Sequence, residues 1–213
     1  MRYNCEGNHN DQGNHGGFND QGNHGGFNDQ GNHGGFAPTY FMAYNPDIHR
    51  RRSIRLKGYD YSQAGAYFVT ICIHQRRSLL GNIQEGIMYP SPAGKMVQII
   101  WDEIPNHYQG IDIDAFVLMP NHIHGIIILE DNCSMKLGDI VHRFKSLTTA
   151  KYCHGVYEKE WPAFETRLWQ RNYHEHIIRN EKSCDRLREY IRDNPILWDL
   201  DTLHPHNPEN FPT

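Results

Sequence analysis

Residues 111–129 read Ile-Asp-Ile-Asp-Ala-Phe-Val-Leu-Met-Pro-Asn-His-Ile-His-Gly-Ile-Ile-Ile-Leu. The stretch contains two runs rich in β-branched and aromatic residues, 111–119 and 122–129, a composition typical of strands. Only Pro120-Asn121 separates the runs, so the sequence predicts a tight antiparallel hairpin. Because residues two apart on a strand share a face, both histidines of this stretch point to one side, and the isoleucine between them points into the core.

The segments on either side of this hairpin alternate between strand and helix patterns. Their order is strand, helix, two strands, helix, strand and helix. This order predicts an α+β fold with a ferredoxin-like antiparallel sheet and helices on one face. The further predicted elements are a strand at 66–73, a small hairpin at 79–89, a helix from Pro92, a helix at 135–152 that buries Leu137, Ile140, Val141, Phe144 and Leu147, a short strand around Trp169, and a helix at 181–194.

The N-terminal segment is a perfect repeat. Asn-Asp-Gln-Gly-Asn-His-Gly-Gly-Phe occurs three times in succession, beginning at positions 10, 19 and 28. Because Gly, Asn and Gln at this density bury too little apolar surface to offset chain entropy, we expect residues 1–39 to be disordered. The sequence therefore predicts three parts: the repeat tail, a catalytic domain over 40–198, and an acidic, Pro-containing tail over 199–213.

Composition narrows the function class. The five cysteines include no C-x-x-C pair, which argues against a disulfide framework or a zinc ribbon. No apolar run is long enough to span a bilayer, so we expect a cytoplasmic, nucleoid-associated protein with no membrane partner. The formal charge of −4 would disfavour nucleic acid binding. However, acidic residues of the two tails carry that charge, the remaining body is slightly basic, and residues 49–57 form either a DNA-contacting arm or a solvated charge run.

Three His-x-His pairs occur among the 15 histidines. One pair, His204 and His206, lies in the Pro-rich tail, where we expect no rigid element to hold ligands. The pair His122 and His124 opens a predicted strand, so both imidazoles can reach one metal ion from a stiff support. Spacing alone leaves open that this pair is simply polar residues on an open sheet face.

The predicted last helix offers a third ligand. Tyr190 and Asn194 lie one turn apart at the edge of its apolar face, so both can face the sheet. A tyrosine packed at the core boundary and an asparagine ending the helix before Pro195 would give the same spacing. The helix pattern therefore makes these two residues candidates, but it does not decide between a role in the site and a purely structural role.

Four stretches, taken in order, are far more specific than any histidine pair. Together they resemble the REP-associated tyrosine transposases, bacterial relatives of insertion-sequence transposases with one catalytic tyrosine and a His-hydrophobic-His motif. The resemblance runs from about residue 50 to about residue 198. The stretches are Phe116-Val-Leu-Met-Pro-Asn-His-Ile-His-Gly-Ile-Ile127, Phe144-Lys-Ser146, Trp169-Gln-Arg-Asn-Tyr-His-Glu-His-Ile-Ile-Arg179 and Glu189-Tyr-Ile-Arg-Asp-Asn-Pro195.

The resemblance implies a role for each matching residue. His122, His124 and Asn194 would bind Mg²⁺ or Mn²⁺, and Tyr190 would be the nucleophile, with Tyr173 as its rival. Cleavage of single-stranded or hairpin DNA would leave a 5′-phosphotyrosine, which the reverse reaction can reseal without ATP.

The resemblance also implies the partners. The substrate would be single-stranded or hairpin DNA, bound by a monomer or a homodimer. A catalytically silent protein that binds hairpin DNA is the alternative. Candidate phosphate contacts are Arg50, Arg51, Arg52, Lys145 and Arg179.

Overall fold

The computed structural model describes residue 56 and residues 58–205. The repeat tail, the three consecutive arginines at 50–52 and the end of the chain from residue 206 lie outside the described residues. No helix in the described part of the chain is long and apolar enough to cross a membrane.

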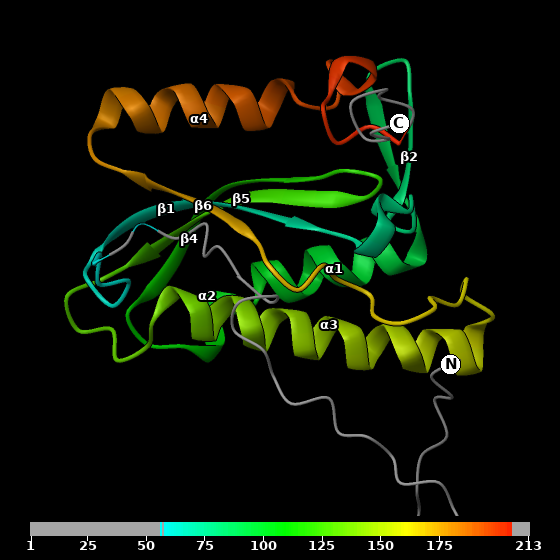
Figure 1. Cartoon of the computed structure of the whole chain (residues 1–213), viewed down its shortest axis with the longest axis horizontal. Coiled ribbons are helices and arrows are strands. Elements are labelled where there is room, and N and C mark those ends of the chain that lie inside the picture. The colour runs from blue at the N-terminus through cyan, green and yellow to red at the C-terminus, as the bar shows by residue number, and fades with distance from the viewer. Residues whose placement is uncertain (1–55, 57, 206–213) are drawn as a thin grey trace, which may run out of the picture. The chain divides into compact units, whose positions relative to one another are not determined.

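A four-stranded antiparallel sheet forms the centre of the fold (Figure 1). Its strands lie in the order β4-β5-β1-β6, which is the ferredoxin-like order. The α+β class and the antiparallel sheet predicted from the sequence are therefore confirmed. The strands are β1 (Gly65–Cys72), β4 (Ile111–Leu118), β5 (His122–Leu129) and β6 (His174–Ile178).

Helices cover both faces of this sheet (Figure 1), whereas the sequence predicted helices on one face. Three helices, α1 (Pro92–Asp102), α2 (Ile104–His107) and α3 (Leu137–Lys159), lie on one side. The last helix, α4 (Glu181–Asp193), lies on the other. The predicted small hairpin is a separate two-stranded sheet of β2 (Gly81–Gln84) and β3 (Ile87–Pro90).

The reason for this correction lies in β5, which is buried on both faces. Ile123 and Ile127 belong to the large core shared with α1 and α3. Ile126 points to the opposite side and packs with Cys184 and Ile191 of α4. Because apolar side chains cover both faces of β5, each face needs its own helix layer.

The strand predicted around Trp169 also differs from the structure. Trp169 makes only an isolated bridge to Ile73, and the paired strand β6 begins at His174. The Trp169 ring is buried in the core instead, where its indole Nε1–H donates to Thr148 Oγ1 at 2.8 Å. A side chain anchored in this way holds the connection from α3, and strand pairing starts after it.

Helix α3 is longer than predicted, and at its positions 147 and 148 the residue that is buried is not the predicted one. Leu147 was expected in the core but is exposed, whereas its neighbour Thr148 is fully buried. Thr148 can be buried because its hydroxyl donates to Phe144 O at 2.7 Å and accepts from the Trp169 indole. A satisfied polar residue thus takes the place of the expected leucine.

Gly125 follows the second histidine and allows the core to close against β5. A Cβ atom at this position would lie 2.3 Å from Trp101 Cζ2, far inside van der Waals contact. Trp101 of α1 is fully buried and therefore packs directly on the strand backbone. Trp101 therefore supports β5, the strand that carries the histidines, on the sheet face that belongs to the large core.

Candidate functional site

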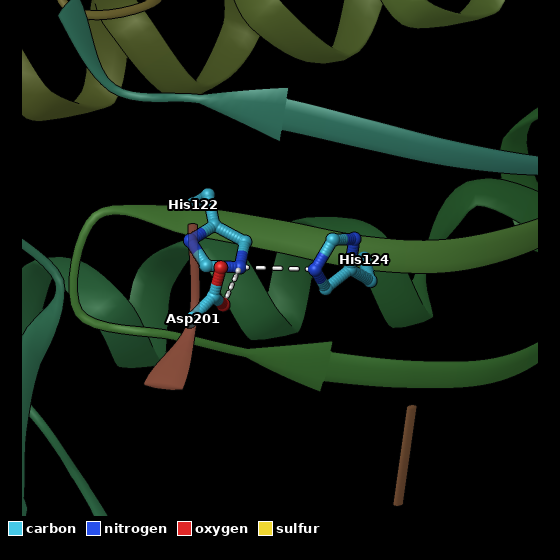
Figure 2. A group of neighbouring side chains, drawn as sticks. All are labelled: His122, His124 and Asp201. Atoms are coloured by element: carbon cyan, nitrogen blue, oxygen red, sulfur yellow. Dashed lines mark hydrogen bonds and ion pairs between the residues drawn. The ribbon is translucent and has the colours of Figure 1, made fainter. Parts of the chain in front are cut away.

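The side chains of the two histidines of β5 lie next to each other (Figure 2). They are on the sheet face where Ile126 packs against α4. Their side chains are almost completely buried, with exposed fractions of 0% for His122 and 3% for His124. The two Nε2 atoms lie 3.0 Å apart. The predicted strand and the shared face of the pair are thus present.

Asn121 sets the orientation of the first imidazole. Its amide Nδ2 donates to the backbone carbonyls of Arg76 (3.1 Å) and Leu203 (2.8 Å), so its Oδ1 is left as the acceptor. His122 Nδ1 lies 2.7 Å from that oxygen and must carry the hydrogen. The Nε2 atom of His122 therefore presents a lone pair.

His124 is held in the same way by Thr70, whose hydroxyl lies 2.8 Å from the imidazole Nδ1. Burial lowers the pKa of His124 to about 3. Burial also lowers the pKa of His122 well below its usual value, and electrostatic interaction with His124 and Arg76, which disfavours a second positive charge here, lowers it further. Both rings are therefore neutral at physiological pH, which is the form that binds metal.

These donors fit a divalent cation. Two ligand atoms of one ion, each about 2.1 Å from it, lie roughly 3 Å apart, which matches the separation of the two Nε2 atoms. Hydrogen bonding at each Nδ1 is the usual arrangement around metal-binding histidines. Among the described residues, Asn194 Oδ1 is a buried oxygen without a hydrogen-bond partner. It can therefore serve as a ligand atom for a cation.

Tyr190 brings a hydroxyl to this pair. Its oxygen lies 3.3 Å from His124 Nε2, and its ring packs edge-on against His124 and Phe68. The side chain remains 41% exposed, so a large substrate can reach it. Burial and the charge of Asp201 raise the pKa of Tyr190, whereas a hydrogen bond with the Asn194 side chain lowers it.

The rival tyrosine lies elsewhere. Tyr173 is buried in the core on the α3 side of the sheet, and Lys145 Nζ lies 5.4 Å from the centre of its ring. The sheet separates this ring from the histidine pair, which faces α4. Of the two candidate nucleophiles, the structure brings only Tyr190 to the histidines.

The two proposed phosphate contacts among the described residues, Lys145 and Arg179, lie away from this pair. Lys145 lies on α3 and donates to the backbone carbonyls of residues 170–172, at 3.0 to 3.4 Å. Arg179 is exposed just before α4 begins, at the opposite end of that helix from Tyr190. The arginines at 50–52 lie outside the described residues.

Sequence reasoning missed Asp201, which we had placed in an acidic tail. Its Oδ2 atom lies 3.6 Å from His122 Nε2, and its side chain is only 6% exposed (Figure 2). The segment that carries it follows α4 through a 3₁₀ turn, Trp198–Leu200, and folds back onto the site. No spacing rule links position 201 to the histidine pair; tertiary contacts make the connection, among them the hydrogen bonds from Asn121 to Leu203 O and from Arg76 to Thr202 O.

Comparison with known proteins bears on this arrangement. The family model described as "Transposase IS200 like" matches residues 64–194, which include β1, the histidine pair and all of α4. The chain belongs to this family. Its members are transposases, so the protein is a DNA-processing enzyme by family. The match ends at Asn194 and does not include Asp201.

Two curated relatives are similar over most of their length. An uncharacterized protein of Haemophilus influenzae is 42% identical over 181 residues, which cover 76% of this chain and 97% of the relative. The REP-associated tyrosine transposase of Escherichia coli K12 is 25% identical over 156 residues, covering 68% of this chain and 79% of the relative. The resemblance inferred from the sequence motifs is confirmed.

A solved structure has the same fold. It is a REP-associated tyrosine transposase bound to a REP hairpin, with a TM-score of 0.50 and 19% identity. The likeness covers 75% of this chain and 91% of that one. It confirms the transposase fold of the described residues.

Proposed function

We propose that this protein is a metal-dependent transposase that cleaves and rejoins hairpin-associated single-stranded DNA through a 5′-phosphotyrosine at Tyr190. One observation carries the proposal. The Tyr190 hydroxyl lies 3.3 Å from His124 Nε2, beside two buried neutral imidazoles whose Nε2 atoms are 3.0 Å apart. A partly exposed nucleophile next to a cation site is the arrangement that phosphodiester transesterification requires.

His122, His124 and Asn194 would hold the cation, which we propose to be Mg²⁺ or Mn²⁺. Such an ion supplies neutralisation of the charge that develops on the phosphoryl oxygens. The protein supplies rigidity. Asn121 and Thr70 lock both imidazoles through their Nδ1 atoms, so the donors are positioned before any substrate arrives.

In the first step, the Tyr190 oxygen forms a bond to phosphorus, and the bond from phosphorus to the 3′-oxygen breaks. The phenol proton passes to solvent, and the released 3′-oxygen takes up a proton to become a free hydroxyl. The new link is still a phosphodiester, so a 3′-hydroxyl can attack it and restore the DNA strand without ATP. Burial and the charge of Asp201 raise the pKa of Tyr190, so the protein alone favours the neutral phenol. A cation held by His122, His124 and Asn194 would favour the phenolate.

A hairpin substrate is supported by the relative that was solved with a REP hairpin. Arg179 is exposed and remains our candidate for a backbone phosphate contact. Lys145 is engaged by three backbone carbonyls, which supports a role in fixing the connection to β6. The basic residues at 50–52 complete the candidate set.

The test is covalent capture of DNA. The full chain is incubated with single-stranded hairpin DNA and Mn²⁺ or Mg²⁺, and a denaturing gel then separates protein joined to DNA. We expect an adduct that needs the metal, disappears in Tyr190→Phe and persists in Tyr173→Phe, the matched control from the opposite sheet face. A wild-type protein that binds hairpin DNA but never forms the adduct would instead be the silent binder.

A further inference from the structure

We infer that Asp201 is a further protein ligand of the divalent cation, which makes the site a two-histidine, one-amide, one-carboxylate set. The inference rests on the proposed function. It extends the site beyond the region that matches the transposase family, because the match ends at Asn194.

The position of the carboxylate is that of a ligand. One oxygen of Asp201 and one ring nitrogen from each of His122 and His124 all lie within 4.8 Å of one another (Figure 2). The separation of 3.6 Å between Asp201 Oδ2 and His122 Nε2 is close to the spacing of two atoms that bind one ion. His122 Nε2 and Asp201 Oδ2 are both electron-rich atoms. A cation between them would bind both.

The other carboxylate oxygen is already committed. Asp201 Oδ1 accepts a hydrogen bond of 2.7 Å from the backbone N–H of Leu203. This local turn, of the kind that aspartate often forms with the residue two positions later, orients the carboxylate and directs Oδ2 toward His122. The carboxylate is thus held in place by its own segment.

The segment itself is attached to the histidine hairpin. Asn121 donates to Leu203 O at 2.8 Å, and Arg76 Nη1 donates to Thr202 O at 3.1 Å. Because Asn121 also accepts from His122 Nδ1, a single side chain orients one imidazole and holds the segment that carries Asp201. Two ligands supplied from distant parts of the sequence are therefore positioned by one residue.

The chemistry of the donor set agrees. Two imidazoles are typical of zinc, copper and other transition metals, whereas carboxylate and carbonyl oxygens suit Mg²⁺ and Mn²⁺. Adding the Asp201 carboxylate to the Asn194 amide oxygen gives two oxygen ligands to balance the two nitrogens. A negative ligand also raises affinity for a hard divalent ion. The buried carboxylate gains a positive partner that the neutral histidines cannot provide.

The experiment measures Mn²⁺ binding to the full chain without DNA, by electron paramagnetic resonance of free Mn²⁺ and by calorimetry. Asp201→Asn is nearly isosteric and keeps the acceptor for Leu203, so the segment should stay folded. We expect its Mn²⁺ affinity to fall by roughly tenfold or more. Asp199→Asn, which changes an exposed acid two residues earlier, should bind as the wild type does. Thermal melting in EDTA checks that both variants are folded.

Each failure has its own signature. If the wild type binds Mn²⁺ and His124→Gln abolishes binding, but Asp201→Asn binds like the wild type, the Asp201 inference is wrong and the proposed function stands. If Asp201→Asn keeps full Mn²⁺ affinity and gains hairpin cleavage, Asp201 only blocks the access of DNA to the site, and the inference is again overturned. If the wild type binds no Mn²⁺ at all, both the metal site and the inference fall.

Discussion

Asn121→Ala is the perturbation that tests how this site is held together. Asn121 is fully buried, and its side chain makes three hydrogen bonds that join three segments. It accepts from His122 Nδ1 and donates to the carbonyls of Arg76 and Leu203. Removing the amide leaves one buried donor and two buried acceptors without these partners.

The expected loss follows from these three groups. Each unpaired buried group costs about 1 kcal/mol or more, so the variant should lose roughly 3 kcal/mol of stability. For a domain of this size, 1 kcal/mol corresponds to about 2–4 °C in melting temperature, which predicts a decrease of about 6–12 °C. Because the imidazole loses the partner that fixes its orientation, Mn²⁺ affinity should also fall by roughly 10- to 100-fold.

Thermal melting followed by circular dichroism, with EDTA and then with saturating Mn²⁺, measures both effects. Asn82→Ala is the matched control, since Asn82 is exposed on the small hairpin. Its melting temperature and Mn²⁺ affinity should match the wild type. A decrease of less than about 3 °C in Asn121→Ala, with Mn²⁺ affinity unchanged, would refute the view that this residue joins the segments.

Three further predictions concern the scaffold. Gly125→Ala places a methyl group against Trp101 and should destabilise the fold by about 1–3 kcal/mol, measured by urea unfolding; an unchanged midpoint would contradict the packing. Thr148→Val leaves the Trp169 indole N–H without its acceptor and should cost about 1–3 kcal/mol in the same assay, whereas Thr148→Ser should recover most of the loss. Burial raises the pKa of Tyr152 to about 12, so the unfolded state releases this proton first and stability should fall as pH rises from 10 to 12. Tyr152→Phe should show a shallower fall over that range in urea unfolding, and an equally steep fall would contradict the assignment.

Local patterns were sufficient to predict the centre of the site. The β-branched composition of 122–129 predicted the strand, and the two-residue spacing of the histidines predicted their shared face; both are observed. The four-residue spacing predicted that Tyr190 and Asn194 would face the sheet together; the Tyr190 hydroxyl lies 3.3 Å from His124 Nε2, and Asn194 is buried. Periods of two and of about four are geometric consequences of strands and helices, so they can be read without knowing the fold.

The errors arose where tertiary contacts overrode the local pattern. Leu147 continues the apolar stripe of α3, yet Thr148 is buried instead because Trp169 supplies a partner for its hydroxyl. In the sequence, Asp201 is one more acid in a polar tail; long-range hydrogen bonds from Asn121 to Leu203 and from Arg76 to Thr202 bring it to the histidines. Neither contact leaves a periodic signal in the sequence.

Placing the chemistry on the α4 face has a mechanical consequence. The histidines belong to β5, which the large core packs against from the other side of the sheet. Tyr190 belongs to α4, in which Cys184 and Ile191 are the buried residues, and Asn194 caps the end of that helix. Arg188 adds a 2.6 Å ion pair to Asp114 of β4, but that pair is partly exposed and is therefore a weak clamp.

The two halves of the site therefore differ in rigidity. The histidine half is fixed by the large core, and the helix half is held by a small cluster of buried residues, Ile126, Cys184 and Ile191. Because Tyr190 and Asn194 lie one turn apart on the same helix, any shift of α4 moves nucleophile and amide ligand together relative to the imidazoles. The segment that continues from α4 to Asp201 is tied to the histidine side by Asn121, so it is placed to limit that shift.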